Sequence, residues 1–205
     1  AQAGEFYTPR AVVKLLVRIL APQPGETVYD PACGSGGMLI EAIRYMNGDD
    51  LCCGSIFGQE KNVVNAAIAK MNLFLHGASD FNVRHGDTLR NPKILQSGAL
   101  ARFDCVIANP PFSLEKWGST EWSNDKYGRN IWGTPSDSCG DFAWIQHMVS
   151  SMAFGKGRMA VVMPQGILFR GQQDGEIRKM LVQSDLVEAV VTLGDKLFYG
   201  TQLSP

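Results

Sequence analysis

The sequence lacks the features that mark membrane-spanning, secreted and strongly basic proteins. None of its apolar runs approaches the roughly 20 residues that a membrane-spanning helix requires. The opening stretch, AQAGEFYTPR, has neither the basic start nor the apolar core of a secretion signal, and no initiator methionine. The formal net charge is -1 and the sequence pI is about 6.3, which argues against a protein that holds nucleic acid through bulk positive charge.

Patterns of metal ligands are missing as well. The cysteines form an odd-numbered set without a repeated ligand spacing: Cys33, Cys52, Cys53, Cys105 and Cys139. The histidines lie far from one another in the sequence, at His76, His85 and His147. We therefore expect reduced thiols, a soluble cytoplasmic protein and no metal site.

What is present is an alternation of strand-like and helical runs. The chain of 205 residues suffices for one large α/β domain, and its predicted strands span residues 27–32, 55–60, 81–87, 103–110, 157–164 and 187–195. The predicted helices between them span residues 36–46, 62–77, 141–155 and 175–183. This alternation predicts a doubly wound, mostly parallel sheet with helices on both faces. The final LFYGTQLSP suggests a piece of a longer polypeptide.

A further helix is predicted ahead of the first strand, in FYTPRAVVKLLVRIL. Thr8 can cap this helix, and Pro9 suits its first turn. Arg10, Lys14 and Arg18 recur every four residues on one face. A solvated polar face is a better explanation of this spacing than a contact with nucleic acid, but both stay open.

Residues 113–140 form a connection much longer than those usual in compact domains. Its aromatic residues are Trp117, Trp122, Tyr127 and Trp132, and its basic residues are Lys116, Lys126 and Arg129. Such interleaving suits stacking on bases and contact with phosphates. It suits a surface loop packed on itself equally well.

In an open parallel sheet, ligands bind beyond the carboxyl ends of the strands. The first predicted strand runs into DPACGSGG, where Gly34 and Gly36 allow a tight turn and the carboxylate of Asp30 suits an ammonium group. The dinucleotide fingerprint G-x-G-x-x-G is incomplete, since Leu39 takes the third glycine position and Asp30 would repel a phosphate. The turn therefore favours a cationic or zwitterionic ligand.

Two further strand ends carry carboxylates. Glu60, in GQEKN, can accept hydrogen bonds from both hydroxyls of a ribose, although a charge that stabilises a helix N-terminus would also explain it. Asp87, in HGDTL, can accept from an exocyclic amine such as that of adenine, or it can serve as a local cap.

The segment NPPF, residues 109–112, follows the fourth predicted strand. The side-chain carbonyl of Asn109 and the backbone carbonyl of Pro110 form two acceptors fixed side by side. Together they can take both hydrogens of a planar amine and aim its lone pair at an electrophile, without a nucleophile from the protein. Phe112 supplies a face on which a flipped base can stack. A stiff turn after a strand is the structural alternative.

Taken in order, FYTPR, DPACGSGG, GQE, GDTL and NPPF resemble the S-adenosylmethionine-dependent DNA adenine-N6 methyltransferases, and more closely the modification subunit of type I restriction-modification systems. The resemblance implies the class I methyltransferase fold, S-adenosylmethionine as cofactor and adenine in DNA as substrate. The cofactor-binding residues that it implies are Phe6, Tyr7, Thr8, Pro9, Arg10, Asp30, Ala32, Cys33, Gly34, Ser35, Gly36, Glu60, Asp87 and Asn109. The implied catalytic group is Asn109, Pro110, Pro111 and Phe112, which would act by positioning the amine rather than by acid–base catalysis.

The resemblance also implies partners. In this family a specificity subunit reads the DNA sequence, which would explain a chain that is not basic, and a restriction subunit completes the system. One catalytic domain would span residues 1–205, with the loop at 113–140 near the target-base pocket. Two segments typical of the family are expected to be missing, a hairpin strand after FYGTQLSP and a helical region before FYTPR.

Other classes of function fit the sequence less well. A nicotinamide-dependent oxidoreductase would need the complete glycine fingerprint and a Tyr-Lys or His-Asp pair, neither of which is evident. A non-catalytic scaffold would not need Asp30, Glu60 and Asn109. Methyltransferases that act on cytosine N4, RNA or protein glutamine are nearer alternatives, because an Asn-Pro-Pro segment suits any planar amine. Phe112 and the FYTP segment favour adenine in DNA.

Overall fold

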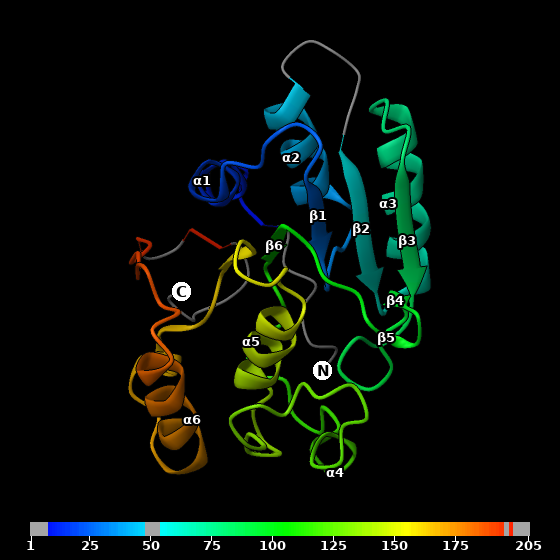
Figure 1. Ribbon diagram of the computed structural model, residues 1–205. Coiled ribbons are helices and arrows are strands. Elements are labelled where there is room, and N and C mark those ends of the chain that lie inside the picture. Colours follow the sequence, from blue (N-terminus) through cyan, green and yellow to red (C-terminus); the bar gives the residue numbers. More distant parts are fainter. Residues whose placement is uncertain (1–7, 48–53, 195–196, 199–205) are drawn as a thin grey trace.

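A computed structural model describes residues 8–47, 54–194 and 197–198 of the chain (Figure 1). Within these residues the main sheet has five parallel strands in the order β3-β2-β1-β6-β7. They are β1 (Thr27–Asp30), β2 (Ser55–Glu60), β3 (Phe81–His85), β6 (Cys105–Ala108) and β7 (Arg158–Val161). The chain winds outward from β1 in one direction and from β6 in the other, so the predicted doubly wound sheet is confirmed.

Helices cover both faces of this sheet (Figure 1). One layer contains α1 (Arg10–Leu20), α2 (Gly37–Asn47) and α3 (Val63–Leu75). The other contains α5 (Asp141–Ser150) and α6 (Gln172–Gln183). The connections contain a hairpin of β4 (Leu95–Gln96) and β5 (Ala99–Leu100), the short helix α4 (Ser119–Trp122) and a 3-10 helix, η1 (Gln165–Leu168).

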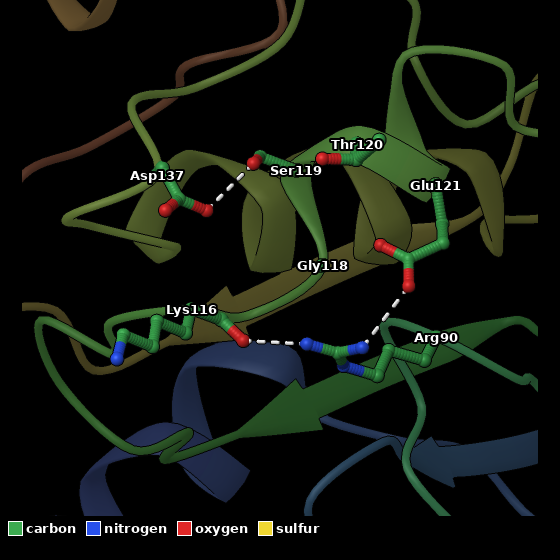
Figure 2. A pocket seen from close by; sticks show the side chains of 7 residues that line it. All are labelled: Arg90, Lys116, Gly118, Ser119, Thr120, Glu121 and Asp137. Atoms are coloured by element: carbon green, nitrogen blue, oxygen red, sulfur yellow. Dashed lines mark hydrogen bonds and ion pairs between the residues drawn. The ribbon is translucent and has the colours of Figure 1, made fainter.

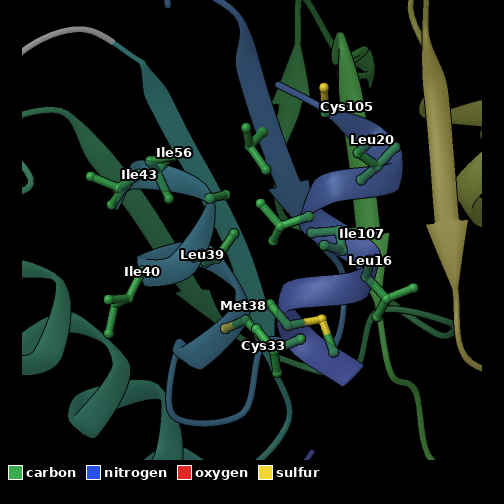
Figure 3. Packing of buried hydrophobic residues seen from close by; sticks show 14 of the residues in the cluster. Leu16, Leu20, Cys33, Met38, Leu39, Ile40, Ile43, Ile56, Cys105 and Ile107 are labelled. Carbon is green, nitrogen blue, oxygen red and sulfur yellow. The ribbon is translucent and has the colours of Figure 1, made fainter. Parts of the chain in front are cut away.

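The central strands are buried on both faces, which explains their nearly continuous apolar sequences. In β1, Val28 belongs to the cluster that α1 and α2 cover, whereas Tyr29 packs on the opposite face with Met148 of α5. Figure 3 shows the first cluster, where Leu16 of α1 lies beside Ile107 of β6. Alternating side chains therefore bind one helical layer to each face.

The predicted cap of α1 is wrong. Pro9 precedes the helix, and no side-chain hydrogen bond caps its start. The side chain of Thr8 is engaged elsewhere, because its hydroxyl oxygen accepts a hydrogen bond from Asn109. Along the helix, Arg10, Lys14 and Arg18 are all exposed, which both interpretations of the basic face require.

Arg158 of β7 holds both the start of β1 and the end of α1. Arg158 lies 2.7 Å from a carboxylate oxygen of Glu26. Its guanidinium also donates to the carbonyls of Leu20 at 2.6 Å and Ala21 at 3.0 Å. These carbonyls end α1, where a helix leaves its acceptors without intrahelical partners. The hydrogen bonds from Arg158 lower the pKa of the Glu26 carboxyl.

The strand predicted at residues 187–195 is wrong for the part that the structure describes. Residues 187–194 form no strand, and Val190 and Val191 are 64% and 54% exposed. The run VEAVVTL has the composition of a strand, but packing and pairing with neighbours determine whether such a segment becomes one. Among the described residues β7 is the outer strand of the sheet. Residues 195 and 199–205 lie outside the described part.

Membrane-spanning helices, metal-ligand clusters and the state of the cysteines can be examined in the described residues. Over the residues that the structure describes, no helix is long and apolar enough to span a membrane. In the same part of the chain, no cluster of three or more His, Cys, Asp or Glu side chains could hold a metal ion. Cys33, Cys105 and Cys139 are free thiols, and Cys52 and Cys53 lie outside the described residues.

Candidate active site

Asp30, Glu60 and Asn109 lie at the carboxyl edge of three adjacent strands. β1 ends at Asp30, β2 ends at Glu60, and β6 ends one residue before Asn109. β1 lies between the other two strands. The winding of the sheet reverses between β1 and β6, and open α/β sheets bind their ligands beyond the strand ends at such a reversal.

The glycine-rich turn after β1 is held against β2 by backbone hydrogen bonds. The N–H of Cys33 donates to the carbonyl of Gln59 at 3.0 Å, and the N–H of Gly34 donates to Oε2 of Glu60 at 2.9 Å. Gly34 has a φ of 53°, a left-handed conformation that suits glycine. A Cβ atom placed on Gly34 would meet nothing within 4 Å, so this part of the backbone faces open space.

Asp30 lies beneath this turn and is only 2% exposed. Burial raises the pKa of its carboxyl to about 8; a hydrogen bond from the N–H of Ala32 opposes this rise, and the nearby charge of Glu60 adds to it. The distance from the Ala32 nitrogen to Oδ1 is 2.9 Å. A cation at the open turn would stabilise the ionised form of Asp30. The site therefore fits a ligand with an ammonium group.

Glu60 combines a structural contact with spare acceptor capacity. Oε2 accepts from Gly34, and Oε1 accepts from the N–H of Asn62 at 2.7 Å. An ionised carboxylate has about four lone-pair positions, so two remain for a ligand. Both the helix-end interpretation and a pair of ribose hydroxyls are compatible with this geometry.

Asp87 follows β3 and takes part in local contacts. Its Oδ2 lies 2.9 Å from Nζ of Lys61, and its Oδ1 accepts from the N–H of Arg90 at 3.2 Å. The second contact is that of a local cap, the alternative that the sequence left open. The neighbouring Thr88 donates its hydroxyl to the carbonyl of Pro31 at 2.6 Å, which ties this loop to the glycine turn.

Asn109 keeps its side-chain oxygen available. Its Nδ2 donates to Oγ1 of Thr8 at 2.8 Å, whereas its Oδ1 is buried and has no hydrogen-bond partner among the described residues. Leaving a buried acceptor unpaired costs about 1–3 kcal/mol, so this oxygen is ready to accept from a ligand N–H. Pro110 follows, itself buried, and its ring restricts the backbone.

Phe112 is half-buried beside this acceptor. Its ring centroid lies 6.3 Å from that of Phe198, with an angle of 64° between the ring planes. Phe198 is 3% exposed and belongs to the core next to α1. Edge-to-face packing of this kind orients an aromatic ring. Phe112 is therefore fixed on one side and partly accessible, as a base-stacking residue must be.

The loop at residues 113–140 is packed largely on itself. Trp117 and Trp122 are 2% and 1% exposed, and their ring centroids lie 5.5 Å apart. Arg129, 2% exposed, pairs with Asp125 at 2.6 Å and lies 4.5 Å over the ring of Trp122. The self-packed interpretation holds for these residues, because buried groups cannot stack on bases or reach phosphates.

The remaining predicted residues of this loop are more accessible. Tyr127 and Trp132 are half-buried, and Lys116 and Lys126 are exposed. The ring of Tyr127 lies 4.9 Å from Nζ of Lys126. Of the aromatic and basic residues predicted in this loop, these four are the accessible ones.

Arg129 also anchors the loop to the centre of the molecule. Its guanidinium donates to the carbonyls of Thr88 and Leu89, each at 2.9 Å. It lies 3.3 Å from Nδ1 of His147, whose pKa is well below its ordinary value because the ring is buried and Arg129 is positive. Nδ1 must then accept, which leaves the proton on Nε2, 3.1 Å from the hydroxyl of Tyr29.

A hollow with a volume of about 440 Å³ opens beside α4 (Figure 2). Its lining comprises Arg90, Lys116, Gly118, Ser119, Thr120, Glu121 and Asp137. Arg90 donates to the carbonyl of Lys116 at 2.6 Å and to Glu121 at 3.1 Å, and Ser119 donates to Asp137 at 2.7 Å. These polar groups satisfy one another, and the predicted cofactor-binding and catalytic residues do not line the hollow.

Some residues that hold the site together were missed from the sequence. Gln59 is fully buried, and its amide donates to the carbonyl of Asn91 at 3.1 Å and accepts from the N–H of Lys93 at 2.9 Å. The only signal was a polar residue inside an apolar strand, which does not reveal its backbone partners. Phe6 and Tyr7, predicted at the cofactor site, lie outside the described residues.

Known proteins are similar to this chain over nearly its whole length. The family model described as N-6 DNA Methylase matches residues 1–204. The type I restriction enzyme MjaVII methylase subunit of Methanocaldococcus jannaschii is 40% identical over 207 residues, which cover 96% of this chain and 34% of that protein. The chain thus spans about a third of the length of this relative.

Solved structures show the same fold. The methyltransferase subunit of a type I restriction-modification system from Streptococcus thermophilus has a TM-score of 0.88 and 34% identity, with 99% of this chain and 44% of that chain covered. The type I restriction enzyme EcoKI M protein has a TM-score of 0.70 and 28% identity, with 97% of this chain and 42% of that chain covered. The parallel sheet and its helical layers are those of the class I S-adenosylmethionine-dependent methyltransferase fold.

Proposed function

Because this chain belongs to the N-6 DNA methylase family, we propose that it transfers a methyl group from S-adenosylmethionine to the N6 amine of adenine in DNA. The observation that carries the proposal is the buried Oδ1 of Asn109, which has no hydrogen-bond partner among the residues that the structure describes. It lies at the strand edge where the glycine turn and Asp30 suit a cationic ligand. An acceptor for an amine and a site for an ammonium group are both needed for this reaction.

S-adenosylmethionine, when bound, would supply an electrophilic methyl group on a sulfonium. Asp30 would hold its ammonium group, and the open backbone at Gly34 would lie along its methionine end. Gly36 lets the turn pass close to Ala69 of α3. The free lone pairs of Glu60 would accept from the ribose hydroxyls. Asp87 would accept from the adenine amine of the cofactor, in competition with its present contact to Lys61.

The target amine would be held by Asn109 and Pro110. Oδ1 of Asn109 and the carbonyl of Pro110 would each accept one of its N–H groups, while Phe112 would stack on the flipped base. Thr8 keeps the Asn109 amide from turning. The two oxygens would also stabilise the positive charge that develops on the amine. The amine would act as the nucleophile: the bond from methyl to sulfur would break as the bond to nitrogen forms, S-adenosylhomocysteine would leave, and the proton that the amine then loses would pass to water.

We further propose that the protein acts as the modification subunit of a type I restriction-modification complex in the cytoplasm. The named relatives are a methylase subunit, a methyltransferase subunit and an M protein of type I restriction systems. The net charge of -1 leaves much of the DNA binding to other subunits. Specificity and restriction subunits are the partners proposed here. Residues 1–205 would form the catalytic domain, with the open part of the 113–140 loop near the target base.

Calorimetric titration of the chain tests the cofactor assignment. S-adenosylmethionine should bind saturably to the wild type and not measurably to Asp30→Ala, and NAD should not bind to either protein. Asp137→Ala removes a carboxylate from the hollow beside α4 and should bind the cofactor as the wild type does. Undiminished binding by Asp30→Ala, or binding of NAD, would contradict the assignment.

A further inference from the structure

A buried carboxylate lies directly behind the NPPF segment. Asp141, the first residue of α5, is 0% exposed. Its Oδ1 accepts from the backbone N–H of Ser113 at 2.7 Å, and Ser113 is the residue that follows Phe112. Its Oδ2 lies 2.5 Å from Nη1 of Arg170. A carboxylate so deeply buried is stable only with partners of this kind, and one of them adjoins the catalytic segment.

Arg170 reaches the same serine from a different part of the chain. It lies in the turn between η1 and α6, and its Nη2 donates to Oγ of Ser113 at 3.3 Å. The turn is fixed from the other side by α6, because Arg178 donates to the carbonyl of Arg170 at 2.6 Å. At Gly166 a Cβ atom would come within 2.9 Å of Nε and Nη2 of Arg170, so a side chain there would displace the guanidinium.

Ser113 needs this support because its backbone is strained. Its φ is 50°, in the left-handed region that residues other than glycine rarely adopt. Such conformations persist where the surrounding contacts determine them, and they are frequent at functional sites. The NPPF segment is therefore fixed at its start by β6, in its middle by two prolines, and at its end by Asp141 and Arg170.

We infer that Asp141 and Arg170 are positioning residues for methyl transfer, which hold the carbonyls of Asn109 and Pro110 in place through Ser113. The inference rests on the proposed function, and neither residue touches DNA or cofactor in it. Loss of the pair would let the turn relax after Phe112. The acceptors would then miss the amine, while the glycine turn and Asp30 would keep their geometry. The effect should fall on the rate of transfer and spare binding of the cofactor.

The test compares variants in the full-length methyltransferase with its partner subunits. Asp141→Asn keeps an oxygen for the Ser113 N–H but loses the ion pair, Asp141→Ala loses both contacts, and Arg170→Lys keeps the charge. Misplacement by about 1 Å costs roughly 100-fold in rate, so kcat should fall about 100-fold in Asp141→Ala and about 10-fold in Asp141→Asn and Arg170→Lys. The Kd of S-adenosylmethionine should stay within about twofold in all three.

Glu26→Gln is the matched control for lost stability. It breaks a comparable ion pair, with Arg158, at the amino ends of the strands. Thermal unfolding ranks all variants by stability, and Glu26→Gln should lose stability with kcat unchanged. If Asp141→Ala does not fold, Asp141→Asn and Arg170→Lys decide the question.

Two outcomes would overturn the inference. One is an unchanged kcat in folded Asp141 and Arg170 variants. The other is a loss of kcat that follows stability in every variant, Glu26→Gln included, which would make the pair merely structural. A wild-type complex that binds S-adenosylmethionine but methylates no adenine would overturn the proposed function first, and this inference with it. That failure concerns the wild type alone and is therefore distinct from the other two.

Discussion

The side chain of Thr8 determines how Asn109 can present its amide. Its hydroxyl is the hydrogen-bond partner of Asn109 Nδ2, at 2.8 Å, and this contact leaves Oδ1 directed away from Thr8. Without the Thr8 hydroxyl, the side-chain amide of Asn109 could rotate and turn its NH2 group toward the target amine. Two hydrogen-bond donors would then face each other. The orientation of one asparagine thus depends on a residue far away in the sequence.

We predict that Thr8→Val lowers kcat and that Thr8→Ser does not. The loss should be about 2- to 10-fold, which corresponds to the ~0.5–1.5 kcal/mol of one neutral hydrogen bond. Serine retains the hydroxyl and should stay within about twofold of the wild type. Methyl transfer to DNA at saturating S-adenosylmethionine measures the effect, and equal rates in the two variants would exclude this role for the hydroxyl.

Asp30 makes stability depend on pH in the sense opposite to most carboxylates. Burial raises the pKa of Asp30 to about 8, so the folded protein keeps a proton that the unfolded chain releases near pH 4. The unfolded state then binds fewer protons than the folded state, and stability falls as the pH rises from about 4 to about 8. An asparagine at position 30 cannot ionise, so a variant that carries it should not lose stability in this pH range.

We predict that Asp30→Asn becomes more stable than the wild type as the pH rises. In thermal unfolding without ligand, the Tm difference between variant and wild type should grow between about pH 5 and pH 8 and then level off. The increase should be at least ~2–4 °C, the shift that 1 kcal/mol produces in a chain of this size. A difference that stays constant with pH would mean that Asp30 is ionised throughout.

Asp104→Asn is the control with the opposite sign. Burial opposes ionisation of Asp104, but hydrogen bonds from Lys156 and Thr27 outweigh burial and lower its pKa to about 2. The stability that Asp104 contributes is therefore present above about pH 4 and is lost only as the pH falls toward 2. Its variant should show a constant deficit between about pH 5 and pH 8.

Residue types at the strand ends were predictable, and their partners were not. Asp30, Glu60 and Asn109 could be singled out because an ionisable or amide residue after an apolar strand suggests a ligand site. The hydrogen bond between Thr8 and Asn109 could not be predicted, because the sequence around Thr8 fits a helix cap equally well. Only the fold brings Asn109 close to Thr8. The contact of Asp141 with Ser113 was hidden for the same reason.

Strand β2 and helix α6 contain glycines for different reasons. At Gly58 in β2, a Cβ atom would lie 3.0 Å from Sγ of Cys33 and 3.1 Å from a methyl carbon of Leu39. Gly58 thus allows β2 to pass close to the glycine-rich turn. At Gly175 in α6, a Cβ atom would lie 3.5 Å from the carbonyl oxygen of Arg170, an ordinary van der Waals distance.

We predict opposite effects for Gly58→Ala and Gly175→Ala. The first should lower the free energy of unfolding by about 1–3 kcal/mol, the usual cost of overpacking a core. The second should raise it by roughly 0.5–1 kcal/mol, because alanine loses less conformational entropy than glycine in a helix. Urea unfolding of the two variants measures both changes, and shifts in the same direction would refute the distinction.

Periodicity identified the elements well where both neighbours of a strand are present. β2 matches its predicted range, residues 55–60, and lies between β1 and β3. The predicted strand at 187–195 has a similar composition, but its described residues have no neighbouring strand, and all of them except Leu193 are exposed. A single segment shows its propensity, whereas pairing is a property of the sheet.

The order of the strands is a property of the whole molecule, and it creates the site. Alternating strands and helices predict a parallel sheet but do not say which strands are adjacent. The order β3-β2-β1-β6-β7 places the ends of β1, β2 and β6 side by side. The sequence singled out these strand ends because ligands bind beyond the carboxyl ends of an open parallel sheet, but it did not predict which of the strands would be neighbours.

Methylation of adenine at N6 is tested most directly by analysis of the product. The full-length protein, with its partner subunits, is incubated with DNA and isotopically methyl-labelled S-adenosylmethionine, and the DNA is digested to nucleosides for mass spectrometry. We predict label in N6-methyladenine for the wild type and none for Asn109→Ala. Label in N4-methylcytosine, or no label in DNA from a complex that binds the cofactor, would contradict the proposed function.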